Sequence, residues 1–321
     1  MKKSILALAG VAILLSSCGG TKFAIMSTGE NLSVLSKVTD REEPCVFPFG
    51  GDYGKDLFFS ACEDGRYFNI YKKDNPFSSA MVQKTSGKNY NLCPAYSAET
   101  GKIAFRCQLE GQATSDIYIM TNSQGKALTQ VTESSEAHED NPCFNSDGSM
   151  LVYNKVINTY YKRTTIFSGN TVVIQNSEIW LKNLKTGESI LLGNGYQPSF
   201  SPDGKKIVYV KYSSDAKSCS IWIMDIDGNN PIQITDAKKG YAYHPKFSPD
   251  GKKIVFDSWK KDKKDTDIYV IDIDGNNLTQ VTINKSYDGQ PYWTKDGYIY
   301  FVSDRGNKAN NMQIWRFKYN D

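Results

Sequence analysis

The chain is poor in the groups that enzymes use for metal, nucleophilic or acid–base chemistry. It has two histidines, His138 and His244, and no Cys-x-x-Cys pair, so neither a metal site nor a cofactor is predicted. The Gly-x-Ser-x-Gly sequence of hydrolase nucleophile elbows is also absent. Setting aside Lys2 and Lys3, 36 of the 38 Lys and Arg residues remain against 35 Asp and Glu. This nearly neutral charge predicts no nucleic-acid partner.

What the chain does contain is a repeated phrase: a proline, an aromatic residue two positions on, a Ser-Pro-Asp-Gly-like turn and a short apolar run. The phrase is clearest from Pro198 and Pro245, weaker from Pro94, Pro142 and Pro291, and degenerate from Pro44. Successive prolines of this set lie 50, 48, 56, 47 and 46 residues apart. A period of this size is typical of architectures whose repeats stack or close into a ring.

Two further phrases recur with the same period. One is Ile followed by an aromatic residue, as at 117–118 and 268–269, and the other is Leu-Thr-Gln-Val-Thr, as at 128–132 and 278–282. Each repeat is therefore predicted to form four short strands: the proline phrase, the apolar run, the Ile-aromatic phrase and the threonine phrase. Strands that are apolar on successive residues are covered on both faces, as in a propeller blade.

The threonine phrase of the last repeat occurs at the other end of the chain. Only six residues follow Trp315, whereas residues 35–39 read Leu-Ser-Lys-Val-Thr. We expect this N-terminal segment to add the outer strand to the last repeat, because closure removes two unpaired sheet edges. The prediction is an all-β, six-bladed β-propeller over residues 31–321, with four antiparallel strands per blade and the ring closed by an N-terminal strand.

The first 17 residues are predicted to be a signal peptide. Lys2 and Lys3 precede the apolar run 5–15, which is too short to span a bilayer in the mature protein. The sequence Leu-Ser-Ser-Cys at 15–18 resembles the bacterial lipoprotein signal, whose cleavage leaves a lipid-modified cysteine, here Cys18. Residues 18–30 are then a flexible tether. The resemblance implies lipid anchoring in the cell envelope, at the outer membrane facing the periplasm; an ordinary secretory signal is the alternative.

The repeat resembles that of a known family. Pro-x-Phe-Ser-Pro-Asp-Gly-Lys, Asp-Ile-Tyr-Val-Ile-Asp and Leu-Thr-Gln-Val-Thr are similar to the WD40-like repeat of TolB-type six-bladed propellers, most strongly in the fourth and fifth repeats. TolB proteins are periplasmic and contact a peptidoglycan-associated lipoprotein and colicins, but the resemblance does not carry those partners over. The same repeat builds the propellers of dipeptidyl-peptidase-type enzymes and of oligogalacturonate lyase, which binds metal through several histidines.

In propellers, function usually lies at the mouth of the central channel. The loops leading into each proline phrase share one face with the loops after each apolar run. The residues predicted to bind a ligand there are Arg41, Glu43, Tyr90, Asn91, His138, Glu139, Asp140, Tyr196, Gln197, Tyr243, His244, Asp288 and Gln290. Such a ring of aromatic, amide and carboxylate groups suits a peptide or a sugar. The alternative is that these are loop residues without a ligand.

The third repeat carries about 14 extra residues on the same face, between Tyr153 and Ile179. Apolar runs on both sides of a Gly-Asn turn predict a protruding hairpin, and insertions on a repeat scaffold often mark the binding face. Its candidate contact residues are Tyr160, Tyr161, Arg163 and Phe167.

The sequence thus favours a lipid-anchored, non-enzymatic binding or scaffold protein for an envelope protein or a glycan. The alternative is a glycan-active lyase or hydrolase that uses His138, Glu139, Asp140 and His244 as acid–base groups. An enzyme would need at least two of these groups to converge in one pocket. The six cysteines that follow Cys18 leave disulfides and free buried thiols equally open.

Overall fold

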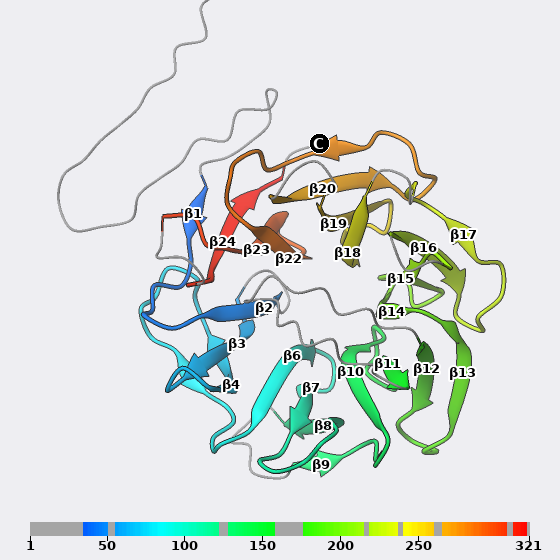
Figure 1. The fold of residues 1–321 in the computed structure, drawn as a ribbon, viewed down its shortest axis with the longest axis horizontal. Helices are drawn as coiled ribbons and strands as arrows, with labels where there is room; N and C mark the ends of the chain where they lie inside the picture. The colour runs from blue at the N-terminus through cyan, green and yellow to red at the C-terminus, as the bar shows by residue number, and fades with distance from the viewer. Residues whose placement is uncertain are drawn as a thin grey trace, which may run out of the picture.

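The protein forms a ring of small β-sheets (Figure 1). The computed structural model describes residues 35–50, 55–121, 128–157, 176–214, 218–236, 240–259, 265–306 and 311–319, and every regular element in them is a strand. No helix in these residues has the length and apolarity that crossing a membrane would need. The predicted all-β propeller is confirmed.

The 24 described strands fall into groups of four with antiparallel neighbours. The first two groups are β2 (Cys45–Gly50), β3 (Leu57–Glu63), β4 (Tyr67–Lys73) and β5 (Val82–Gln83), then β6 (Tyr90–Ser97), β7 (Lys102–Gln108), β8 (Asp116–Thr121) and β9 (Thr129–Gln130). The next two are β10 (Ala137–Phe144), β11 (Met150–Ile157), β12 (Ser177–Asn183) and β13 (Ser189–Asn194), then β14 (Tyr196–Phe200), β15 (Lys206–Tyr212), β16 (Cys219–Asp225) and β17 (Ile232–Gln233). The last two are β18 (Tyr241–Phe247), β19 (Lys253–Trp259), β20 (Thr266–Asp272) and β21 (Thr279–Gln280), then β22 (Asp288–Trp293), β23 (Tyr298–Ser303) and β24 (Gln313–Lys318) with β1 (Ser36–Lys37).

We term the strands of each group a to d, with strand a nearest the centre of the ring (Figure 1). The b strands are buried over their central residues, as residues 207–210 of β15 illustrate. Apolar side chains of neighbouring groups meet between the sheets: Val255 and Ile268 of the fifth group pack with Trp293 and Phe301 of the sixth. The core is therefore distributed between the blades, as the consecutively apolar strands predicted.

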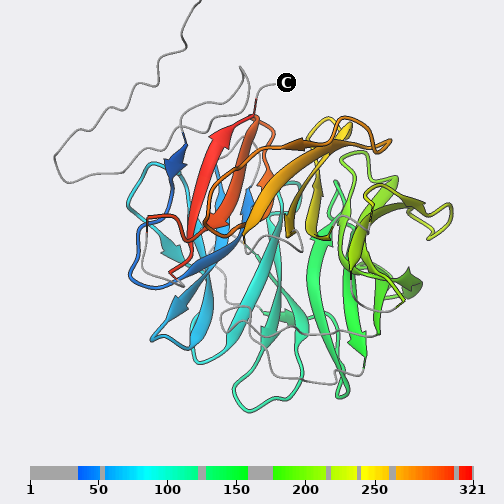
Figure 2. The same ribbon diagram turned by 45° about the horizontal axis from the view of Figure 1, so that its top comes forward.

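The N-terminal strand closes the ring. Ser36 pairs with Arg316 and Lys37 with Trp315, and Figures 1 and 2 both show β1 beside β24. The N–H of Val38 donates to the carbonyl of Ile314 at 2.7 Å. Leu35 is fully buried in the cluster that contains Trp315. The predicted pairing of the two ends of the chain is confirmed.

The two shorter recurrent phrases bind each other. In five groups, the threonine hydroxyl that follows strand d accepts a hydrogen bond at 2.8 or 2.9 Å from the N–H of the isoleucine in strand c. The pairs are Thr85 with Ile70, Thr132 with Ile117, Thr235 with Ile221, Thr282 with Ile268 and Thr39 with Ile314. The N-terminal segment thus makes the same bond to the last group that each internal d strand makes within its own.

The Ser-Pro-Asp-Gly turns are held by their own side chains. In the fourth group, Asp203 Oδ1 accepts from the Ser201 hydroxyl at 2.6 Å and from the N–H of Lys205 at 3.1 Å. Gly204 has a φ of 70°, which glycine adopts more readily than other residues. The Asp-Gly segment therefore turns the chain from strand a to strand b without a ligand.

The first repeat departs from the prediction in its proline. The register of β2 breaks between Val46 and Phe49, and the other a strands break beside their blade prolines in the same way. Pro48, not Pro44, is therefore the equivalent residue, and it lies 46 residues before Pro94. Two positions after Pro48, where the pattern expects an aromatic residue, the chain has Gly50. Thr294 Cγ2 occupies the space that a Cβ at this position would need.

Candidate functional site

The centre of the ring is lined by residues with an uncommon backbone conformation. Each residue directly before a blade proline has a φ between 50° and 54° and is part of a register break in strand a. These six pre-proline residues are Phe47, Cys93, Asn141, Gln197, His244 and Gln290. Residues other than glycine rarely take this conformation, and bulges that impose it re-aim a side chain. Here the bulges turn the side chains of neighbouring blades toward one channel.

Side chains of the preceding blade hold several of these residues in place. Gln197 Oε1 accepts from the N–H of His244 at 2.8 Å, and Gln290 Oε1 accepts from the N–H of Phe47 at 2.8 Å. Asn154 Oδ1 accepts from the N–H of Gln197 at 3.2 Å. At these three junctions, the bulged backbone N–H is thus satisfied by a side chain of the preceding blade.

The channel opens into a cavity of about 270 Å³ on the face formed by the d–a and b–c connections. We term it the mouth cavity. Its polar lining consists of Arg106, Asp140, Asn141, Asn154, Gln197, His244 and Gln290. Apolar walls come from Val46, Phe68, Leu92, Val156 and Met312, among others. Apolar walls with a few fixed polar groups are the usual composition of a ligand pocket.

A much smaller space in the channel adjoins the mouth cavity and shares the six pre-proline residues with it. This narrow section, about 50 Å³, is lined by the six pre-proline residues, four of the blade prolines (Pro48, Pro94, Pro142 and Pro291), Phe49 and Lys246. Beyond it lies a second cavity of about 300 Å³ on the face of the a–b turns. Phe49 and Lys246 line both of these spaces, so the two spaces adjoin each other.

Two charged pairs face or support the mouth cavity. His244 Nδ1 lies 2.8 Å from Asp257 Oδ1, and the same oxygen accepts from the N–H of Gln290 at 3.1 Å. Because the carboxylate accepts, the proton of a neutral His244 sits on Nδ1, and Nε2 has no partner in the described residues. The guanidinium of Arg106 lies 3.9 Å from a carboxylate oxygen of Asp140. The cavity therefore offers an oriented imidazole and a loosely held ion pair.

Five of the predicted ligand-binding residues line the mouth cavity: Asp140, Tyr196, Gln197, His244 and Gln290. The other eight, Arg41, Glu43, Tyr90, Asn91, His138, Glu139, Tyr243 and Asp288, do not. Six of these eight residues lie in a strands and not in loops, and successive side chains of a strand point to opposite sides. Asn91, for example, is buried and donates to Asn69 at 3.0 Å within the blades.

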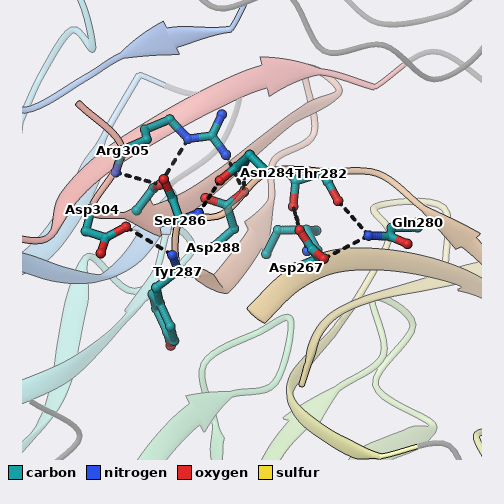
Figure 3. A network of polar contacts seen from close by, with 11 residues as sticks. Asp267, Gln280, Thr282, Asn284, Ser286, Tyr287, Asp288, Asp304 and Arg305 are labelled. Carbon is teal, nitrogen blue, oxygen red and sulfur yellow. Dashed lines mark hydrogen bonds and ion pairs between the residues drawn. The ribbon is translucent and has the colours of Figure 1, made fainter. Parts of the chain in front are cut away.

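Asp288 is the clearest case of a predicted ligand-binding residue that stabilises the fold instead. It is fully buried and accepts from Arg305 and, at 2.9 Å, from Asn284 (Figure 3). Beside it, Asp267 accepts from Gln280 at 2.8 Å in the same view. These bonds hold the connection between β21 and β22 and leave Asp288 unavailable to a ligand.

Of the four predicted acid–base groups, two line the mouth cavity and two lie away from it. His138 contacts the Ser115 hydroxyl at 3.2 Å, and burial lowers its pKa. Glu139 is buried 3.6 Å from the Lys155 ammonium, and burial raises its pKa. Asp140 and His244 line the mouth cavity together, but the carboxylate bonded to His244 is that of Asp257. In the described residues, no group of three or more His, Cys, Asp or Glu is placed to hold a metal ion.

The sequence analysis missed Arg106, Lys246 and Asp257. Arg106 and Asp257 lie in b strands, which had been treated as purely apolar runs. The available signal was a charged residue inside such a run, as in Ile254-Val255-Phe256-Asp257. The six cysteines of the described residues are buried and unpaired, which decides between the two alternatives for those thiols. Cys18 and the hairpin residues Tyr160, Tyr161, Arg163 and Phe167 lie outside the described residues.

Comparison with known proteins identifies the same architecture. Residues 183–321 match the model of the TolB beta propeller domain. The Tol-Pal system protein TolB of Francisella tularensis subsp. mediasiatica is 35% identical over 219 residues, which is 65% of this chain and 44% of that protein. The chain thus spans less than half the length of this relative.

Solved structures agree on the fold. A TolB-designated protein from Agrobacterium tumefaciens superposes with a TM-score of 0.63 at 18% identity, covering 94% of this chain and 100% of that one. Oligogalacturonate lyase from Vibrio parahaemolyticus superposes with a TM-score of 0.60 at 15% identity, covering 93% and 96%. Identities this low establish the fold and leave the activity open. With its recurrent phrases, its closed ring and the match of residues 183–321 to the TolB domain model, this chain is a β-propeller that is similar to propellers of the TolB type.

Proposed function

We propose that this protein is a non-enzymatic binding protein of the cell envelope whose mouth cavity receives a segment of a partner protein. The observation that carries the proposal is the mouth cavity itself, in which amide and imidazole groups held by neighbouring blades face apolar walls. The similarity of this chain to Tol-Pal system proteins supports the proposal that it belongs to an envelope assembly. In this proposal, lipid on Cys18 holds the protein at the outer membrane, facing the periplasm.

A protein segment suits this cavity better than a glycan does. Val46, Phe68, Leu92, Val156 and Met312 supply apolar surface that can take up aliphatic side chains. The amide side chains between them can bind the N–H and carbonyl groups of a peptide backbone. Sugar rings carry hydroxyl groups on most of their carbons, and burying those against such walls without hydrogen bonds is unfavourable.

A second candidate function, a glycan-active lyase or hydrolase, has one observation in its favour. The contact of His244 with Asp257 orients the imidazole as in many general bases. A lyase assay on polygalacturonate with the native protein and a His244→Gln variant tests this reading. Turnover that disappears in the variant would replace the binding proposal with an enzymatic one.

Photo-crosslinking in cells tests the binding proposal directly. Phe68 lines the mouth cavity and Phe77, which is 76% exposed, lies outside it. Each is replaced in turn by benzoylphenylalanine, which resembles the native side chain. We expect a defined adduct with an envelope protein from position 68 and none from position 77. Equal adducts from both positions, or none from position 68, would refute a partner site at the mouth cavity.

A further inference from the structure

The narrow section of the channel contains an unpaired positive charge. Lys246 follows Pro245 in β18 and lines both the narrow section and the second cavity. Among the described residues its ammonium has no hydrogen bond and no ion pair, and it is the one Lys, Arg, Asp or Glu that lines the narrow section. A partly buried charge without a counter-ion is unfavourable unless something else compensates it.

Two amide groups beside Lys246 are oriented as donors. The Oε1 atoms of Gln197 and Gln290 each accept from a backbone N–H, at 2.8 Å in both cases. Since a backbone N–H can only donate, this assignment fixes which end of each amide is oxygen. The NH2 groups then have no acceptor in the described residues, and both side chains line the narrow section.

We infer that the narrow section binds a carboxylate of the partner segment, with Lys246 as its counter-ion and the NH2 groups of Gln197 and Gln290 as donors. This inference rests on the proposed function, because the segment enters through the mouth cavity. The space of about 50 Å³ admits a small group and not a whole residue. A carboxylate is small, planar and accepts several hydrogen bonds at once, so it matches three donors from three successive blades.

An acidic peptide is favoured over an acidic sugar for the reason given for the mouth cavity. The groups adjoining the carboxylate must lie against Phe47 and the apolar wall above it. An aspartate or glutamate flanked by aliphatic residues meets this requirement. The acidic group of a uronic acid brings ring hydroxyls into the same place.

The test starts from random short peptides displayed on phage and selected against the full-length protein. A selected peptide is synthesised in two forms, one with its acidic residue and one with the amide isostere, Asp→Asn or Glu→Gln. Binding of both forms is measured by calorimetry to the native protein and to Lys246→Met, Lys246→Arg and Lys252→Met. Lys252 is an exposed lysine in the adjacent turn and serves as the matched control. Circular dichroism confirms that each variant is folded.

We expect the native protein to bind the acidic form at least about tenfold more tightly than its isostere, as charge-assisted hydrogen bonds require. In Lys246→Met the two forms should bind with equal affinity, whereas Lys246→Arg and Lys252→Met should retain the preference for the acidic form. Added salt should reduce the ratio. Equal binding of both forms, or an unchanged ratio in Lys246→Met, overturns the carboxylate inference and leaves the mouth-cavity proposal standing.

Two other outcomes are informative in different ways. If digalacturonate binds in a manner that depends on Lys246 and no peptide does, the ligand is an acidic sugar and the peptide inference is wrong. If neither probe binds, and position 68 also gives no adduct, the proposed function fails together with the inference that rests on it.

Discussion

The hydroxyl of Thr39 provides the sharpest test of how the two ends of the chain stabilise the ring. Thr39 is 2% exposed and its Oγ1 accepts from the N–H of Ile314 at 2.8 Å. Thr282, which is fully buried, makes the same bond to Ile268 at 2.9 Å within an internal blade. Thr→Val at either position preserves the branched shape and removes the acceptor; at Thr282 it also removes a long hydrogen bond of 3.4 Å that the hydroxyl donates to Asp267 Oδ1.

Both substitutions leave a buried backbone N–H without a partner, which costs about 1–3 kcal/mol of unfolding free energy. If the N-terminal strand belongs to the cooperative fold, Thr39→Val and Thr282→Val should destabilise the protein by similar amounts. Thr279, an exposed threonine of β21, is the matched control, and Thr279→Val should change the unfolding free energy by less than about 0.5 kcal/mol.

The measurement is urea unfolding of the purified protein, followed by the fluorescence of its five tryptophans. The free energy of unfolding of each variant is compared with that of the native protein, with one common value for the dependence of this free energy on urea concentration. A loss in Thr282→Val together with an unchanged Thr39→Val would show that the N-terminal strand pairs without contributing to stability. That result would refute the reasoning that closure supports the ring.

Three further predictions concern the anchor, the insertion and pH. Cys18→Ser should release the protein from the membrane fraction into the soluble fraction, because the lipid is the proposed anchor; continued sedimentation with membranes would contradict it. Deleting residues 158–175 should leave the free energy of unfolding unchanged but weaken partner binding by about 2 kcal/mol, as the loss of a hot-spot cluster would. Unchanged binding would show that the insertion does not contribute to the binding face. Because burial raises the pKa of Glu139, its side chain holds a proton more tightly in the folded than in the unfolded protein, so stability should fall as pH rises through the raised pKa. Glu139→Gln should flatten that fall in unfolding measured from mildly acidic to neutral solution, while Glu136→Gln, at an exposed position, should not.

The blades could be predicted from sequence because their recurrent phrases bind one another. The isoleucine of strand c and the threonine after strand d recur together, since one donates the hydrogen bond that the other accepts. The same reasoning located the closing strand, because residues 35–39 carry a threonine phrase that had no partner nearby. The first blade proline was misplaced because Gly50 stands where the pattern expected an aromatic residue.

The site was only partly predictable, because the backbone conformation decides to which side of the strand a polar side chain points. A run such as His138-Glu139-Asp140 reads as one polar cluster, yet Asp140 alone lines the mouth cavity. The turn toward the channel occurs at the pre-proline residue, whose positive φ is uncommon for residues such as Phe, Cys and Gln and was not predicted. Side chains from strands a and b, such as Lys246 and Arg106, then complete the lining.

The bulges also explain where the proposed binding groups originate. A bulge removes a backbone N–H from the sheet ladder, and that N–H must find another acceptor. At two blade junctions the acceptor is the Oε1 of Gln197 or Gln290. Satisfying the backbone in this way orients each amide, and both side chains line the narrow section together with Lys246. The bonds that join neighbouring blades therefore prepare the donors that a carboxylate would use, so that rigidity of the ring and recognition at its centre share the same side chains.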